Sequence, residues 1–299
     1  MSGQSPDQPH FATAAVLGVG LIGASFALAA KAAGLVDRVI GVARREETRR
    51  IALDRGAADE VTDDPVAAVA EADLVYLSVP VGVMDDMLAA MAPALRAGTL
   101  ITDAASVKAH VCRAAEAVLP PTVAFVGGHP MAGSERSGPE AAREHLFRGH
   151  AYFLVPTSLG GDEALAKVAC LVDAIGGVPS VVDASLHDHL VAATSHLPHA
   201  VAMALSLAVA ELVPDHDARV RFTGSGLRDT TRIAASSPEV WRDIFLANAA
   251  EVVAGCRSAS ASLDALAEAI ATGDADRLTD LLRDARAARL SLDAGRDRP

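Results

Sequence analysis

The sequence has few aromatic, cysteine and basic residues, and each shortage limits what the core can contain or what the protein can bind. Aromatic residues make up only 3% of the 299 residues while 51% are hydrophobic, so the core must consist mainly of Ala, Val and Leu. Three cysteines, Cys112, Cys170 and Cys256, lie far apart without a CxxC, so they suggest neither a disulfide framework nor a zinc site, and a reducing cytoplasm fits. Lys and Arg number 26 against 38 Asp and Glu, and the net charge of −12 argues against nucleic acid or an anionic membrane as a partner.

A membrane segment is also not expected, although residues 11–30 contain no charged side chain and are long enough to resemble one. Residues 1–10 contain Asp7 but no Lys or Arg, so the positively charged start of a signal peptide is missing. Glycines at 18, 20 and 23 suit a turn better than a helix that faces lipid. The sequence also contains no internal repeat or low-complexity segment.

Apolar strand patterns alternate with helical patterns up to about residue 183. Because these strands are almost continuously apolar, they favour an α/β fold with a mostly parallel sheet that helices cover on both faces. A length of 299 residues is sufficient for two domains. Strands are predicted at residues 14–17, 38–42, 73–80, 99–103, 125–129, 152–155 and 178–182, and helices at 21–31, 46–55 and from about Ser106.

A glycine-rich string follows the first predicted strand and opens the first predicted helix, which is the context of the dinucleotide-binding fingerprint. The glycines allow a tight turn and a close approach of backbone N–H groups to a pyrophosphate at the helix N-terminus. A glycine-rich turn without a ligand is the alternative, but the correct flanks favour nucleotide binding. The predicted cofactor residues are Gly18, Gly20, Leu21, Ile22 and Gly23, together with Ser78, Val79 and Pro80 at the end of a later strand.

Beyond residue 183 the pattern becomes helical. Helices are expected over residues 186–212, with an interruption at Pro198, and over 238–272 and 274–290. Residues 200–210 carry no charge on any face, which predicts burial all round and a subunit interface. We therefore predict a Rossmann-type dinucleotide-binding domain over residues 1–183 and an all-α substrate and dimerisation domain over 184–299, in a homodimer.

Two polar residues are candidates for the catalytic centre. His129 follows an apolar run with two glycines and precedes Pro130, which favours extended backbone for the residue before it. His129 is therefore expected at the open end of a strand, where an open α/β sheet places its chemistry. Histidines beside glycines are, however, more often turn residues than catalysts. Ser106 can cap the helix that follows, or present its hydroxyl near His129, and both roles can hold in part.

Two pairs of polar residues are candidates for substrate binding. His196 and His199 share one face if their segment is helical. A zinc pair lacks a third ligand, so a pair that faces the substrate is preferred. Arg228 and Arg232 are either surface cations that pair with Asp229, or ligands that grip a carboxylate with two hydrogen bonds.

Glu135 and Trp241 complete the candidate substrate site. Glu135 is either a solvated charge or a group that closes over the site and partners a cation. Trp241 follows the arginines in an apolar segment.

The residues after the second strand favour NADP⁺ over NAD⁺. An acid expected about 20 residues beyond the fingerprint binds the adenosine ribose and repels a 2′-phosphate. Ala43 stands there instead, followed by Arg44 and Arg45, which can pair with that phosphate. The alternative is that both arginines are solvated charges at the start of the next helix.

Several strings, in the same order along residues 12–250, together closely resemble the prephenate/arogenate dehydrogenase family. The resemblance implies a Rossmann-type domain joined to a helical dimerisation domain. It also implies NAD(P)-dependent oxidative decarboxylation of prephenate to 4-hydroxyphenylpyruvate, or of arogenate to tyrosine. The strings are GVGLIGAS (18–25), TDAASVK (102–108), GHPMAGSERSG (128–138), LFRG (146–149), SHLPH (195–199) and GLRDTTRIAASSPEVWRDIFLAN (226–248).

The resemblance also implies roles for the candidate residues. His129 matches the base that takes the proton of the reacting hydroxyl, and Ser106 matches a serine on the same hydroxyl near the nicotinamide. Arg232 matches an arginine that holds a substrate carboxylate. The remaining matches to the substrate pocket are His199, Trp241, Glu135, Arg228 and His196.

Other functions remain open. A 3-hydroxyacid dehydrogenase would need a catalytic lysine in the helical domain, and no Lys occurs after Lys167. A dehydrogenase of 4-amino-4-deoxyprephenate and a non-catalytic NAD(P)-sensing protein are further alternatives. Some family members carry an ACT-type regulatory domain, which we do not expect here because the chain ends at Pro299.

Overall fold

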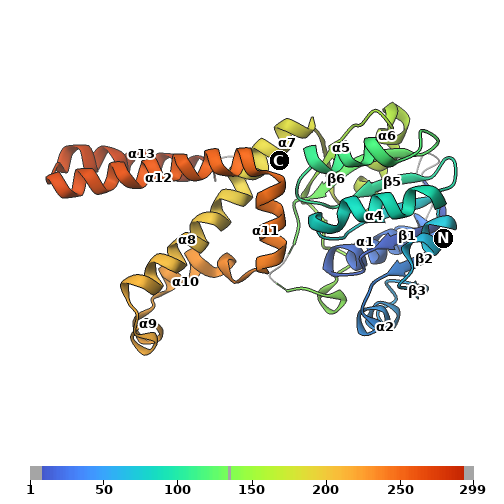
Figure 1. Cartoon of the computed structure of the whole chain (residues 1–299), viewed down its shortest axis with the longest axis horizontal. Helices are drawn as coiled ribbons and strands as arrows, with labels where there is room; N and C mark the ends of the chain where they lie inside the picture. The colour runs from blue at the N-terminus through green and yellow to red at the C-terminus, as the bar shows by residue number, and fades with distance from the viewer. Residues whose placement is uncertain (1–8, 134–135, 293–299) are drawn as a thin grey trace.

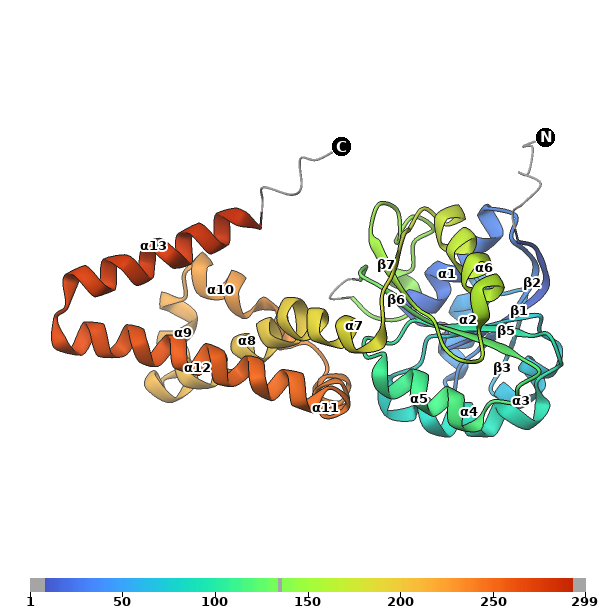
Figure 2. The same cartoon turned by 90° about the horizontal axis from the view of Figure 1, so that it is seen from above.

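The computed structural model describes residues 9–133 and 136–292, which form a sheet domain and an extended helical domain (Figures 1 and 2). The sheet has 8 strands in the order β3-β2-β1-β4-β5-β6-β7-β8. Strands β1 to β6 run parallel, β7 pairs antiparallel to β6, and β8 pairs parallel to β7. This confirms the predicted α/β fold with a mostly parallel sheet. The strands are β1 (Phe11–Leu17), β2 (Val36–Val42), β3 (Glu60–Thr62), β4 (Leu74–Leu77), β5 (Leu100–Asp103), β6 (Ala124–Pro130), β7 (Ala151–Val155) and β8 (Val178–Val181).

Helices cover both faces of the sheet, as Figure 2 shows. α1 (Leu21–Ala32), α2 (Glu46–Asp54) and α6 (Gly161–Ala174) lie on one face. α3 (Pro65–Ala70), α4 (Met84–Met91) and α5 (Ala109–Val118) lie on the other. Each face has its own buried hydrophobic core, which explains why the strands are apolar without alternation.

Two short elements were not predicted from the sequence. β3 has only three residues at the sheet edge, and none of them is fully buried, so its hydrophobic pattern is weak. α3 follows it, with Asp64 as the N-cap and Pro65 in the first turn. Short 3₁₀ turns at Val81–Val83, Ala92–Ala94 and Pro139–Ala141 join other elements.

The helical domain departs from the prediction at two points. Pro198 does not interrupt its helix: a π turn at Ala192–His196 precedes it, and Pro198 then lies in the first turn of α8, which requires no N–H from it. The predicted helix over 238–272 is instead two helices, because Asn248 has the non-helical dihedrals φ −118° and ψ 35°. The elements are α7 (Ala184–Val191), α8 (Leu197–Leu212), α9 (His216–Phe222), α10 (Ser225–Thr231), a 3₁₀ turn at Arg232–Ala235, α11 (Pro238–Ala247), α12 (Ala249–Thr272) and α13 (Ala275–Ser291).

The helical domain leaves a large apolar surface uncovered within one chain. Ala202 is the one fully buried residue of α8, so burial of residues 200–210 on every face does not occur in the protomer. Leu207 is 74% exposed and Leu212 is 80% exposed. α12 and α13 form a hairpin that projects away from the sheet domain (Figure 1) and exposes Leu263 and Ile270. Exposed apolar side chains in such number are typical of a surface that contacts another protein chain.

The continuous helix Ala184–Leu212 is the one described segment long and apolar enough to cross a membrane by length and composition. Its polar residues Asp188 and His196 are, however, buried in contacts with other parts of the protein. These contacts tie the first half of the helix to the rest of the protein.

Candidate active site

The glycine turn between β1 and α1 has the shape that a dinucleotide pyrophosphate requires. Gly18 has a φ of +98°, and a Cβ added there would lie 2.3 Å from the carbonyl oxygen of Ser78. A Cβ on Gly23 would lie 2.1 Å from the carbonyl oxygen of Gly18. A Cβ on Gly20, in contrast, would meet no atom of the described chain within 4 Å. The first and third glycines thus allow close packing, while the second leaves open space at the N-terminus of α1, which suits an anion.

The other predicted cofactor residues lie around the same edge of the sheet. Ser78 to Pro80 directly follow β4, which pairs with β1 at the point where the strand order reverses. Arg44 and Arg45 follow β2 and are exposed. The side chain of Arg49 donates to the carbonyl oxygens of Ala43 at 2.8 Å and Arg44 at 3.0 Å, so it holds this turn in place.

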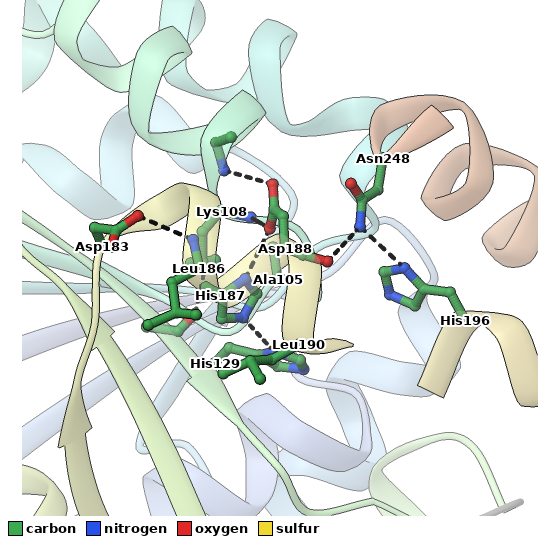
Figure 3. Close-up of polar contacts among 12 residues, drawn as sticks. Ala105, Lys108, His129, Asp183, Leu186, His187, Asp188, Leu190, His196 and Asn248 are labelled. Carbon is green, nitrogen blue, oxygen red and sulfur yellow. Dashed lines mark hydrogen bonds and ion pairs between the residues drawn. The ribbon is translucent and has the colours of Figure 1, made fainter. Parts of the chain in front are cut away.

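His129 lies near the carboxyl end of β6, as predicted, and contacts a residue of the helical domain. It is half-buried and pairs with Phe153 of β7. Its Nδ1 atom lies 2.8 Å from Nε2 of His187, which α7 supplies. Nδ1 of His187 lies 2.7 Å from the carboxylate of Asp188 (Figure 3). A hydrogen-bonded row of His129, His187 and Asp188 therefore joins the two domains.

The direction of these hydrogen bonds follows from the carboxylate at one end. Asp188 is held ionised: burial raises its pKa, but hydrogen bonds from His187, Lys108 and Ala109 lower it by more. His187 donates from Nδ1 to this carboxylate, so its Nε2 accepts the Nδ1 proton of His129. Burial, followed by the electrostatic effect of His187 and Lys108, lowers the pKa of His129 well below its usual range and keeps the ring neutral. His129 is thereby left with a free lone pair on Nε2, which is the form a general base needs.

A buried ion pair supports the strand end beneath His129. Lys108 and Asp103 are fully buried and form a salt bridge, and Nζ of Lys108 also donates to the carbonyl oxygen of Gly128 at 2.6 Å. Asp103 accepts the N–H of Gly128 at 2.9 Å. Since both backbone groups of Gly128 are bound, the direction in which His129 leaves the strand is fixed.

The expected capping role of Ser106 is wrong. α5 begins at Ala109, with Lys108 at the N-cap position, so the helix starts two residues later than that role requires. Asp188 of the helical domain caps α5 instead, because its carboxylate accepts the N–H groups of Lys108 at 2.7 Å and Ala109 at 2.9 Å. Ser106 is half-buried in the loop after β5, so its hydroxyl is left for another role.

The structure brings Trp241 together with His196, the last residue of the π turn, and His199 of α8. His199 stacks on Trp241, with ring centroids 3.5 Å apart, and its Nδ1 lies 2.9 Å from the carbonyl oxygen of Ser195. His196 meets the same indole edge-on, with centroids 6.0 Å apart. Burial lowers the pKa of His199; the hydrogen bond to Ser195 opposes this shift, and the charge of Arg232 adds to it.

The remaining predicted site residues are less tightly placed. Arg228 and Arg232 are both exposed in the single chain, with Arg228 on α10 and Arg232 at the start of the following 3₁₀ turn. Glu135 lies outside the described residues, and its role stays a prediction.

Sequence reasoning missed His187, Asp188 and Asn248. The first two stand together directly after the predicted domain boundary, but a His-Asp pair in a helix carries no specific signal. Asn248 is hidden in an otherwise helical pattern, and only the break between α11 and α12 identifies it.

Fold and site together define a Rossmann-type dehydrogenase with a helical second domain. The family model described as "Prephenate dehydrogenase, nucleotide-binding domain" matches residues 26–181, and "Prephenate dehydrogenase, dimerization domain" matches residues 183–284. The chain belongs to the prephenate dehydrogenase family.

Individual relatives agree with this assignment. The chain is 39% identical over 287 residues to cyclohexadienyl dehydrogenase of Zymomonas mobilis. The aligned region covers 95% of this chain and 97% of that protein. The crystal structure of Aquifex aeolicus prephenate dehydrogenase with hydroxyphenyl propionate and NAD⁺ has a TM-score of 0.87 and 32% identity, covering 94% of this chain and 98% of that one. Synechocystis arogenate dehydrogenase has a TM-score of 0.77 and 30% identity, covering 94% and 99%.

Proposed function

We propose that the protein catalyses the NAD(P)⁺-dependent oxidative decarboxylation of prephenate or arogenate. The observation that carries the proposal is the row His129–His187–Asp188, which leaves Nε2 of His129 as a hydrogen-bond acceptor at the carboxyl end of β6. The same edge of the sheet carries the glycine turn that suits a dinucleotide. A base beside a hydride acceptor is the arrangement that oxidation of an alcohol needs.

Each residue of the proposed catalytic centre has its own role in the reaction. Nε2 of His129 takes the proton of the ring hydroxyl, and His187 and Asp188 stabilise the imidazolium that forms. Ser106 is assigned to the same hydroxyl. When bound, the nicotinamide would supply the acceptor for the hydride of the carbinol carbon. The ring carboxylate leaves as CO₂, and its bonding electrons make the ring aromatic.

The substrate side is assigned to the helical domain. Arg232 binds a carboxylate of the substrate, and His199, held by its stack on Trp241, contacts the substrate beside it. His196, Arg228 and Glu135 are assigned to the same pocket.

NADP⁺ is the preferred cofactor in this proposal. Ala43 supplies no acid for the ribose, and the exposed Arg44 and Arg45 are available for a 2′-phosphate. The hydrogen bonds from Arg49 to this turn support the proposal, because they hold the backbone that carries both arginines.

The proposed enzyme works as a cytoplasmic homodimer. The uncovered apolar surface of α8, α12 and α13 supports the dimer, and the low cysteine content supports a reducing compartment.

The test is a steady-state matrix of prephenate and arogenate, each with NAD⁺ and NADP⁺. We expect turnover of at least one substrate with release of CO₂. Absence of turnover in all four combinations, with a folded protein that binds the cofactor, would refute the proposal and favour a sensing role.

A further inference from the structure

One buried polar atom of the substrate side has no partner. His196 is 1% exposed, and its Nε2 atom makes no hydrogen bond within the described part of the chain. Buried nitrogen atoms of this kind are rare in folded proteins, because water binds them in the unfolded chain and the lost hydrogen bond must be replaced. His196 lies against Trp241, next to His199, so the atom belongs to the wall of the proposed substrate site.

The identity of this atom as a donor follows from Asn248, which lies at the junction of α11 and α12. Nδ2 of Asn248 lies 2.9 Å from the carbonyl oxygen of Asp188 (Figure 3). A carbonyl oxygen only accepts, so the amide nitrogen must face it, and this fixes the orientation of the side chain. The second proton of the same nitrogen points to Nδ1 of His196 at 3.3 Å.

The other ring nitrogen must then carry the proton. Nδ1 of His196 accepts from Asn248 and is therefore unprotonated. Burial lowers the pKa of His196 to about 4, so the ring is neutral at physiological pH. A neutral imidazole with a bare Nδ1 has its proton on Nε2. The unpartnered atom is thus an N–H group that lacks an acceptor.

Asp188 gives His129 and His196 opposite hydrogen-bonding roles at Nε2, one as acceptor and the other as donor. The carboxylate of Asp188 acts through His187 and leaves Nε2 of His129 as an acceptor. The backbone carbonyl of Asp188 acts through Asn248 and leaves Nε2 of His196 as a donor. A ligand held between them must present a hydroxyl to one histidine and an oxygen acceptor to the other.

We propose that Asn248 is a positioning residue that fixes His196 as a hydrogen-bond donor, and that Nε2–H of His196 binds a carboxylate or carbonyl oxygen of the substrate. This inference rests on the proposed function for the chemical class of the substrate. A carboxylate or carbonyl oxygen only accepts, so it matches the Nε2–H donor of His196, while the hydroxyl is engaged by His129. Opposite polarities at two points orient an asymmetric ligand in one direction.

The first test reads the tautomers without any turnover. The full-length protein is labelled with ¹⁵N at histidine, and the ring nitrogens of His196 are assigned by comparison with His196→Gln. We expect Nδ1 to resonate as an unprotonated nitrogen and Nε2 as a protonated one. Asn248→Asp, which replaces a donor by an acceptor of the same shape, should reverse the two. A wild-type ring protonated on Nδ1 would overturn the inference even if the enzyme is active.

The second test measures what the donor does for the substrate. His196→Phe keeps a flat ring but removes the N–H, and should raise KM for the accepted substrate roughly five- to a hundredfold, as expected for an unpaired buried group. His196→Gln places an amide N–H near the same point and should remain within about threefold of the wild type. The Kd of the cofactor should not change in either variant.

The outcomes separate this inference from the proposed function. If the wild type turns over prephenate or arogenate but His196→Phe leaves KM unchanged, the donor serves only the fold and the inference fails. If no substrate turns over, the proposed function fails, and the ¹⁵N tautomers still decide whether Asn248 sets the polarity of His196.

Discussion

Nδ1 of His129 lies 2.8 Å from Nε2 of His187, and this contact joins a strand of the sheet domain to a helix of the helical domain. His187 is fully buried, and the carboxylate of Asp188 beside it also caps α5. The proposed base thus acquires its correct tautomer only when α7 is docked against α5. The contacts that hold α7 against α5 are therefore also the contacts that orient the proposed base.

Removal of the proposed base should slow the chemical step. His129→Ala should lower kcat by roughly 10²–10⁴ while the Kd of the cofactor is retained, because the hydroxyl proton loses its acceptor. Stopped-flow measurement of cofactor reduction gives the rate. His145→Ala, at an exposed position, is the matched control and should behave as the wild type. A loss of tenfold or less would exclude His129 as the base.

The pH profile should show a base with a depressed pKa. Neutral His129 is the active form, so activity is present above its pKa and is lost as the pH falls through it. Burial, together with His187, Lys108 and His196, lowers the pKa of His129 well below its usual 6.5. We therefore expect kcat/KM to stay constant through neutral pH and to fall only in acid below pH 6.5. A fall that begins above this value would contradict the assignment.

Loss of the proposed carboxylate ligand should weaken substrate binding. Arg232→Ala removes a charge-assisted hydrogen bond, which should raise KM about ten- to a hundredfold. Arg228→Ala, one helical turn earlier, is the matched comparison. Initial rates over a wide range of substrate concentrations separate KM from kcat. If KM is unchanged in Arg232→Ala and raised in Arg228→Ala, the role belongs to Arg228.

The apolar surface of the helical domain should hold a dimer together. Sedimentation velocity at micromolar concentration should show the mass of two chains. Leu207→Glu places a charge on an apolar side chain that is 74% exposed in the protomer, and should shift the protein toward the monomer. Leu53→Glu, on the sheet domain, is the control and should leave the dimer intact. A wild-type monomer at this concentration would exclude the proposed assembly.

The cofactor preference should depend on Arg44. The wild type should have a higher kcat/KM with NADP⁺ than with NAD⁺, and Arg44→Ala should reduce that ratio roughly tenfold, the contribution of one charge-assisted hydrogen bond. Arg50→Ala removes an exposed cation of α2, the helix that follows Arg44, and should leave the ratio unchanged, since Arg50 pairs with Asp54. A wild type that prefers NAD⁺, or an unchanged ratio in Arg44→Ala, would refute the placement of the 2′-phosphate.

Patterns among neighbouring residues were sufficient to predict most of the strands, the first helix and the glycine turn. Apolar runs alternating with helical patterns predicted the sheet, and GxGxxG after a strand predicted the turn where Gly18 and Gly23 pack without room for a side chain. The position of His129 at a strand end followed from the glycines and Pro130 around it. The same rules failed at β3 and at Pro198, where a weak edge pattern and a π turn replaced the expected signals.

The sequence alone determined most of the strands of the sheet and the residue near the end of β6, since neighbouring residues set backbone conformation. Only the tertiary structure decided what each polar group does. Asp188 caps a helix 79 residues away and orients His187, so Ser106 is released from capping. Asn248 reaches His196 across 52 residues of sequence. Such partners carry no periodic signal, because a hydrogen bond between distant segments depends on how the domains pack and not on the spacing of residues along the chain.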